Sequence, residues 1–313
     1  MMKIMPAVRE QVVLEGTLPG ELQEMLQNVS EYGNPMGESP RKRVRWTKDL
    51  EQPPRDLSKE DGSESVEVLW YVSDYYAYHG RGNDAARALT RVFNRLEVDF
   101  GILGTLEKCD GDSQRLVGET GLFEELAQHN DEQFQKYKHG TLVVTDPHAF
   151  NAFKNHYPKV TGNEYRVAHY TQYLSNRLKE LKPLLVKPYE KKLTFHDPCY
   201  LGRHNGEYQA PRDLVVAIPG AEFMEMYRCR EQSYCCGGGG GGMWLDGVSA
   251  DHTRERLSEN RVREAVEIGA EVLVVCCPYE VSRFEDAVKS TDNEGKLEVR
   301  DIAEILDYCM DGV

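Results

Sequence analysis

The chain has 313 residues, and its 38 basic and 52 acidic side chains give a formal net charge of −14. This acidic balance argues against a surface of clustered Lys and Arg that would neutralise phosphates, so we expect no nucleic-acid partner. No apolar run approaches the roughly 20 residues that span a bilayer, and the first residues lack the apolar stretch of a secretory signal, so we expect a cytoplasmic chain that does not itself span a membrane.

The first 65 residues are predicted to form an extended N-terminal arm. They show little periodicity apart from a short amphipathic stretch at 18–29, and segment 59–65 is polar enough to be a linker. A disordered tail is the alternative interpretation. Several apolar side chains favour docking of part of the arm on another surface: Leu22, Met25, Leu26, Tyr32 and Trp46.

From residue 66 onward, short apolar runs alternate with amphipathic ones, which is typical of βαβ units around a parallel sheet. We expect strands at 66–72, 100–103 and 141–145, and helices at 84–96, 116–128 and 148–155. A polar stretch at 182–192 separates the halves, and the order then starts again. The second half is predicted to have strands at 193–196, 221–224 and 271–275 and helices at 211–218, 253–268 and 281–289, with 299–306 closing the chain.

The predicted fold class is therefore α/β, with two Rossmann-like parallel-sheet domains related by an approximate two-fold. We place the domains at 66–181 and 182–313, after the arm at 1–65. In this arrangement the second half repeats the first.

Four of the eight cysteines follow predicted strands of the second half. Cys199 follows the strand at 193–196, Cys235 and Cys236 follow the strand at 221–224, and Cys277 ends the strand at 271–275. Because the carboxyl ends of parallel strands converge on one edge, these thiols should meet. Converging thiolates suit an iron–sulfur centre first and zinc second. Separate buried cysteines beside a flexible glycine loop remain the alternative.

Three segments carry a resemblance to a known family. They are 196–203 (His-Asp-Pro-Cys-Tyr-Leu-Gly-Arg), 233–244 (Ser-Tyr-Cys-Cys, six glycines, Met-Trp) and 275–287 (Val-Cys-Cys-Pro-Tyr-Glu-Val-Ser-Arg-Phe-Glu-Asp-Ala). They resemble the cysteine-rich CCG-domain family, which includes the catalytic subunits of heterodisulfide reductases and iron–sulfur subunits of glycolate and anaerobic glycerol-phosphate dehydrogenases. Segments 31–35 and 43–46 are similar to the region after the ferredoxin-like domain of longer members, so the resemblance covers nearly the whole chain.

The family pattern occurs twice per chain, and the first copy is altered here. Asp74 stands in the position of Cys199, Cys109-Asp110-Gly111 in that of Cys235-Cys236-Gly237, and Asp146 in that of Cys277. Only Cys109 survives as a thiol, so this copy cannot hold a thiolate-ligated cluster. Either Asp74, Asp110, Asp146 and His148 form a hard-metal site for Mg²⁺ or Mn²⁺, or they are solvated or hydrogen-bonded in an empty crevice.

For the second copy, the resemblance implies one [4Fe-4S] cluster, of the non-cubane kind found in the family, with Cys199, Cys235, Cys236 and Cys277 as ligands and Gly237 beside them. Glu280 takes the position of the family's last cysteine. With four thiolates instead of five, a cubane is the other possibility. Zinc is the less favoured metal.

Four further residues of this region and its surroundings are assigned by position. Cys276 precedes Cys277 on a strand, where neighbouring side chains point to opposite faces, so we expect it beside the cluster or buried. His196 would act catalytically, as a proton donor or a hydrogen-bond donor to sulfur, unless it merely caps its turn. Cys229 and Cys309 are interpreted as structural.

The resemblance implies an iron–sulfur redox subunit of a multi-subunit oxidoreductase, transferring electrons to or from a small thiol or disulfide substrate. The chain lacks both a bacterial-type ferredoxin run and a Gly-x-Gly-x-x-Gly fingerprint between a strand and a helix. It should therefore need a ferredoxin-type iron–sulfur subunit, with a flavoprotein beyond it, and the arm should dock on that partner. One alternative is an electron-relay subunit of a quinone-linked or hydroxy-acid dehydrogenase. Another is a scaffold subunit with structural zinc.

Overall fold

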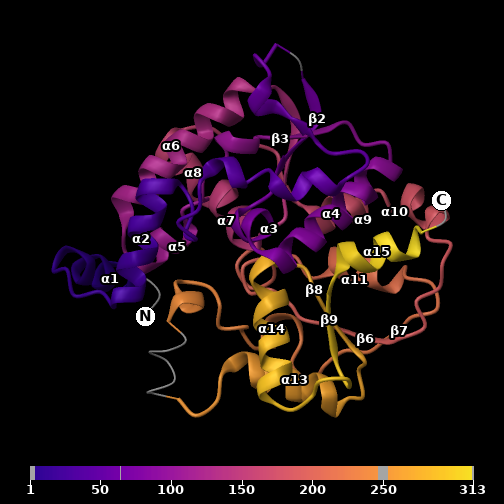
Figure 1. Ribbon diagram of the computed structural model, residues 1–313. Coiled ribbons are helices and arrows are strands. Elements are labelled where there is room, and N and C mark those ends of the chain that lie inside the picture. The colour runs from indigo at the N-terminus through magenta and orange to yellow at the C-terminus, as the bar shows by residue number, and fades with distance from the viewer. Residues whose placement is uncertain (1–3, 64, 246–252, 312–313) are drawn as a thin grey trace.

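The structure, a computed structural model, describes residues 4–63, 65–245 and 253–311. Two sheets of parallel strands lie one above the other in Figure 1. The first has the order β1-β3-β2-β4-β5 and the second β7-β6-β8-β9. Their strands are β1 (Arg55–Asp56), β2 (Val66–Tyr71), β3 (Phe100–Ile102), β4 (His139–Val144), β5 (Val167–His169), β6 (Lys192–Phe195), β7 (Glu222–Phe223), β8 (Val272–Val275) and β9 (Glu298–Asp301).

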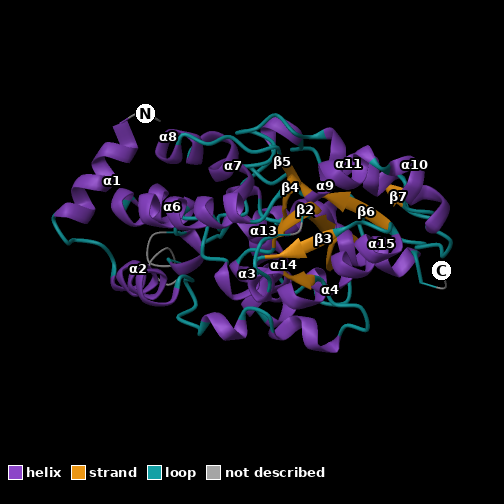
Figure 2. Ribbon diagram, turned by 90° about the horizontal axis from the view of Figure 1, so that it is seen from above, coloured by secondary structure: helices purple, strands orange, loops and turns teal. Residues whose placement is uncertain are grey.

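The order of four strands is the same in both sheets, which confirms the predicted repeat of two Rossmann-like halves. β3-β2-β4-β5 corresponds to β7-β6-β8-β9, and every pairing is parallel. The central strands are apolar along most of their length because parallel sheets are covered on both faces. Figure 2 shows helices on both sides of the strands.

The helices of the first half cover β1 to β5, and those of the second half cover β6 to β9. In the first half they are α3 (Asp74–Tyr78), α4 (Gly80–Arg95), α5 (Asp112–Val117), α6 (Thr120–Lys136), α7 (Pro147–Asn155), α8 (Tyr157–Thr161), α9 (Tyr170–Asn176) and α10 (Leu178–Leu181). In the second half they are α11 (Gln209–Val216), α13 (Leu257–Glu267), α14 (Pro278–Ser290) and α15 (Ile302–Cys309).

The N-terminal segment is more structured than the sequence pattern predicts. It contains α1 (Ile4–Leu14) and α2 (Gly20–Tyr32), and β1 pairs with β3 through Arg55 and Gly101. Trp46 is buried against Trp70 of β2, with ring centroids 5.7 Å apart. The apolar side chains of α2 pack against the first half through Leu22, Met25 and Val29, which contact Cys109, Val117 and Leu126. The arm thus docks on its own chain, and docking on a partner stays a prediction.

Two predicted helices have other bounds in the structure. The helix expected at 116–128 is two helices, α5 and α6, because Gly118 takes a left-handed φ of 103° and ends the first of them. The helix expected at 253–268 begins only at Leu257.

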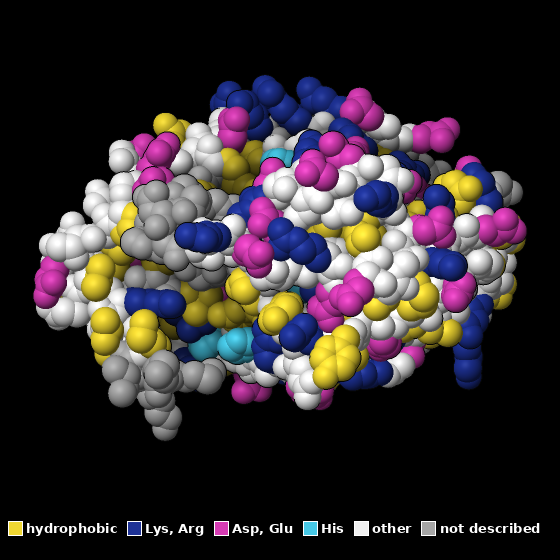
Figure 3. Space-filling model, turned by 90° about the horizontal axis from the view of Figure 1, so that it is seen from below, with side chains coloured by type: hydrophobic (Ala, Val, Ile, Leu, Met, Phe, Trp, Pro, Cys, Tyr) yellow, Lys and Arg dark blue, Asp and Glu magenta, His cyan; other side chains and the backbone are white. Residues whose placement is uncertain are grey.

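The charge distribution on the surface and the polarity of the helices complete the description of the fold. In Figure 3, acidic and basic side chains are interspersed over the face seen from below. Within the described ranges, each helix is too short or too polar to cross a lipid bilayer.

Candidate functional site

The carboxyl ends of β6 and β8 bring the second-half motifs to one sheet edge. The strands are neighbours, and the backbone N–H of His196 donates to the carbonyl of Val274 at 3.0 Å. Cys199 follows β6 after a short turn, and Cys277 is the N-cap of α14, whose first helical residue is a proline. The parallel register thus places both loops side by side.

Three thiols form a continuous hydrogen-bonded group at this edge. Hydrogen bonds from the thiols of Cys199 and Cys236 lower the pKa of Cys235 and favour its thiolate. The same bond raises the pKa of Cys199, and burial adds to that rise. The backbone N–H groups of Gly237 and Gly238 donate to Cys235 Sγ at 3.3 Å and to Cys236 Sγ at 3.4 Å. The loop therefore stabilises negative charge on sulfur.

The two cysteines after β8 point into different surroundings. Cys276 is fully buried in the apolar core that both halves share, whereas Cys277 lies outside that core and is 3% exposed. Burial raises the pKa of both thiols. The charge of Cys277 also contributes to the raised pKa of Cys236.

A buried histidine and a buried carboxylate complete the site. One ligand atom each of His196, Cys236 and Glu280 lie within 4.8 Å of one another. His196 Nε2 is 3.3 Å from Glu280 Oε1, and neither Nε2 nor Glu280 Oε2 has a hydrogen-bond partner. Burial raises the pKa of Glu280, and the neighbouring Cys235 adds to the rise. Unpartnered polar atoms at such depth are costly unless a ligand satisfies them, so the residues present fit a metal centre.

The glycine run at 237–242 closes tightly over the site. Gly237 has a left-handed φ of 80°, and a Cβ on Gly242 would lie 2.1 Å from the Gly237 carbonyl oxygen. A Cβ on Gly239 would lie 2.6 Å from Cε1 of His148 in the first half. The absence of side chains lets this backbone pass between the two halves.

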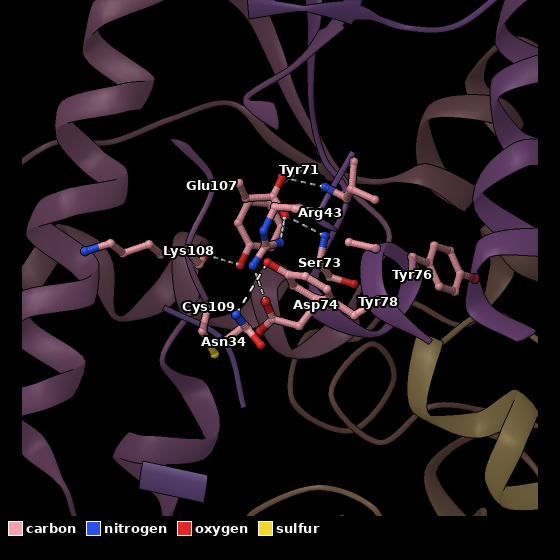
Figure 4. A network of polar contacts seen from close by, with 12 residues as sticks. Asn34, Arg43, Tyr71, Ser73, Asp74, Tyr76, Tyr78, Glu107, Lys108 and Cys109 are labelled. Atoms are coloured by element: carbon pink, nitrogen blue, oxygen red, sulfur yellow. Dashed lines mark hydrogen bonds and ion pairs between the residues drawn. The ribbon is translucent and has the colours of Figure 1, made fainter. Parts of the chain in front are cut away.

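The equivalent place in the first half is filled by an ion-paired arginine (Figure 4). Arg43 Nη1 binds Glu107 Oε1 at 2.6 Å, and Arg43 Nη2 forms a buried ion pair with Asp74. Glu107 also accepts the backbone N–H groups of Val72 and Ser73, at 3.0 and 2.9 Å. Burial raises the pKa of Glu107 to about 7, although Arg43 opposes the rise.

The other first-half residues are also held by hydrogen bonds. Asp110 accepts the N–H of Asp112 at 2.7 Å, and Asp146 accepts the N–H of His148 at 2.8 Å. His148 Nδ1 pairs with Asp112 Oδ2 at 2.8 Å. Among the described residues, only His196, Cys236 and Glu280 group as a possible metal site, so the geometry favours the hydrogen-bonded crevice over a hard-metal site.

Two arginines important to these sites escape the sequence patterns. Arg43 lies in a segment without periodicity. Arg261 lies on α13 and is buried, although an arginine on a helix is usually expected to face solvent. Segment 43–46 carries part of the family resemblance, but neither the resemblance nor any spacing predicts the buried partners of Arg43 or Arg261. Cys229 and Cys309 lie on ordinary segments, Cys309 being buried in the shared core.

The comparisons with known proteins agree with this arrangement. The profile of the cysteine-rich domain family called CCG matches residues 70–154 and 193–279. The iron-sulfur-binding oxidoreductase FadF of Bacillus subtilis, named as probable, is 36% identical over 97% of this chain and 43% of its own. The EtfAB:quinone oxidoreductase of Syntrophomonas wolfei is 36% identical over 99% of this chain and 43% of its own.

The match to a third relative covers a larger share of that relative's own length than the matches to the first two. It is one of the subunits of the dihydromethanophenazine:CoB--CoM heterodisulfide reductase of Methanosarcina barkeri, and it is 32% identical over 97% of this chain and 72% of its own. The chain thus spans less than half the length of the first two relatives.

Proposed function

The chain belongs to the cysteine-rich CCG-domain family, and from this premise we propose that it is an iron–sulfur redox subunit of a multi-subunit oxidoreductase. The observation that carries the proposal is the meeting of Cys199, Cys235 and Cys236 beside the buried, unpartnered atoms of His196 and Glu280. Soft thiolates in this number are typical iron–sulfur ligands.

Cys199, Cys235, Cys236 and Cys277 would hold one [4Fe-4S] cluster, and Glu280 would offer Oε2 at the position of the family's fifth thiolate. When bound, such a cluster accepts and donates single electrons. The N–H groups of Gly237 and Gly238, which face the sulfurs of Cys235 and Cys236, would stabilise the more negative state. A carboxylate is a harder ligand than thiolate, so Glu280 would also shift the potential.

The substrate that fits this site best is a small thiol or disulfide. Cys199 and Cys235 are partly exposed, whereas Cys236 and Cys277 are buried. A substrate sulfur would therefore approach from the side of Cys199 and Cys235. The named activity of the Methanosarcina relative concerns a heterodisulfide, which supports this substrate class. Electrons would come from a ferredoxin-type subunit and a flavoprotein.

An electron-relay role is the second candidate. The Syntrophomonas relative is named as an EtfAB:quinone oxidoreductase and has a higher identity than the Methanosarcina relative. In that role the subunit would pass electrons onward to a quinone and bind no thiol at the cluster. Anaerobic spectra decide between the two candidates, because only a thiol-binding cluster changes its signal when a disulfide or thiol is added.

The experiment that tests the proposal is anaerobic purification of the chain, with iron, sulfide and zinc quantified. We expect iron and sulfide for one cluster per chain and a brown protein. Stoichiometric zinc without sulfide would contradict the proposal and favour the scaffold role, and two clusters per chain would contradict our interpretation of the first half.

Substitution of single cysteines gives a matched pair. Cys236→Ala should lose nearly all bound iron, because Cys236 is the thiol that lies among Cys235, His196 and Glu280. Cys109→Ala should keep full iron content, because Cys109 lies in the first half beside Asp74. Iron content measured on both folded variants checks the prediction, and equal loss in both would contradict it.

A further inference from the structure

A buried arginine on α13 contacts the histidine of the site from behind. Arg261 Nε donates to His196 Nδ1 at 3.2 Å. Its other N–H groups are also engaged: Nη1 donates to the Arg228 carbonyl at 2.6 Å and to Glu264 Oε2 at 2.9 Å, and Nη2 to the Phe195 carbonyl at 3.4 Å. Arg261 is fully buried. Its guanidinium is therefore held in one orientation.

This contact determines which nitrogen of His196 carries hydrogen. A guanidinium has only donors and stays protonated in proteins. An N–H on Nδ1 would face the N–H of Arg261 directly, so Nδ1 must present its lone pair. A neutral imidazole has one N–H, and that hydrogen is then on Nε2.

The opposite nitrogen points into the candidate site. Nε2 lies 3.3 Å from Glu280 Oε1, and a ring nitrogen of His196 lies within 4.8 Å of Cys236 Sγ. It has no hydrogen-bond partner and His196 is 0% exposed. A buried donor with this environment needs an anionic acceptor.

We propose that Arg261 is a positioning residue that holds His196 as the Nε2–H tautomer, so that His196 donates to the anionic centre bound by the cysteines and Glu280. The tautomer itself follows from this chain's own contacts, and the role toward the centre rests on the proposed function. Because a protonated Nε2 has no lone pair for a metal, His196, Cys236 and Glu280 do not together form a three-ligand zinc site.

The first experiment tests the tautomer and does not need the cluster. The full chain, labelled with ¹⁵N-histidine and purified without metal, is studied by long-range ¹H–¹⁵N NMR, with His196→Gln to assign the signal. We expect the Nε2–H pattern in the wild type and in Arg263→Met, an exposed-site control on the same helix. Arg261→Met should populate the Nδ1–H form. An Nδ1–H pattern in the wild type overturns the inference, and this measurement requires no folded variant of Arg261.

The second experiment tests the role toward the cluster through its reduction potential. Loss of an N–H donor destabilises the more negative state, so Arg261→Met and His196→Leu should each shift the potential to a more negative value. In the double variant we expect no shift beyond that of His196→Leu. If Arg261→Met shifts the potential equally in both backgrounds, Arg261 acts by its charge alone and the inference fails. A chain that binds no iron fails the proposed function instead, and the NMR result then stands by itself.

Discussion

At the scale of single residues, the first half holds a buried arginine between two carboxylates. Arg43 and Asp74 are 3% and 5% exposed, and Glu107 lies on the other side of the guanidinium. Buried ion pairs gain little over apolar packing, but removal of one partner leaves an uncompensated charge. The triad therefore fixes how segment 40–49 attaches, because any other position of Arg43 would leave two carboxylates unpaired.

Replacement of Arg43 should accordingly be severe. We expect Arg43→Met to lower the free energy of unfolding by about 3–5 kcal/mol, because Asp74 and Glu107 lose their buried cation. Arg45→Met, an exposed neighbour, should cost less than about 1 kcal/mol. Urea denaturation of both variants checks the difference. A similar loss in both would show that the triad does not stabilise the fold.

At the scale of elements, apolar periodicity predicted the strands and helices that are long and strongly patterned. β2, β4 and β8 are buried runs, and α4 has an apolar face that the core covers. β1 has two residues and is held by its pairing with β3, which no local pattern reveals. The cysteines could be placed at one edge because parallel strand ends converge. The roles of Arg43 and Arg261 could not be predicted, because the carboxylates of Asp74 and Glu107 and the imidazole of His196 lie far from them in sequence.

The contact between α5 and α7 predicts a pH-dependent stability. His148 lies in the first turn of α7 and pairs with Asp112 of α5. Burial lowers its pKa, but the hydrogen bond to Asp112 and the charge of Asp146 outweigh burial and raise the pKa to about 9. A raised pKa means that the charged form stabilises the fold below about pH 6.5, and that this contribution is lost as the pH rises through about 9.

Comparison with His148→Gln isolates this contribution. Near pH 6 the free energy of unfolding of the wild type should be larger than that of the variant by up to about 3 kcal/mol. This difference should shrink steadily as the pH rises to 10. Urea denaturation across this range measures it. A difference that does not change with pH would contradict a protonated His148.

At the scale of the whole molecule, the two halves are joined by a shared core and by buried polar contacts. The largest apolar cluster runs from β2 and β4 through β6 to α15. Asp301, where β9 meets α15, accepts hydrogen bonds from Tyr76 of α3 and Tyr170 of α9, the latter at 2.8 Å. Arg81 of α4 binds Glu285 and Glu304 of the second half at 2.7 and 2.6 Å. Through these contacts the first half supports the sheet edge on which the second-half thiols lie.

The shared core and the polar contacts between the halves predict that the halves unfold together. Tyr170→Phe removes a hydrogen bond to a buried carboxylate and should cost about 1.5–3 kcal/mol, whereas Tyr227→Phe, at an 85% exposed position, should cost little. Hydrogen exchange of peptides from β4 and β8, followed at increasing urea, reports each half separately. Because the core is continuous, both peptides should lose protection at the same, lowered urea concentration in Tyr170→Phe. Earlier loss in one peptide alone would show that the halves unfold independently, and the first half could then not act as the rigid support of the cysteine site.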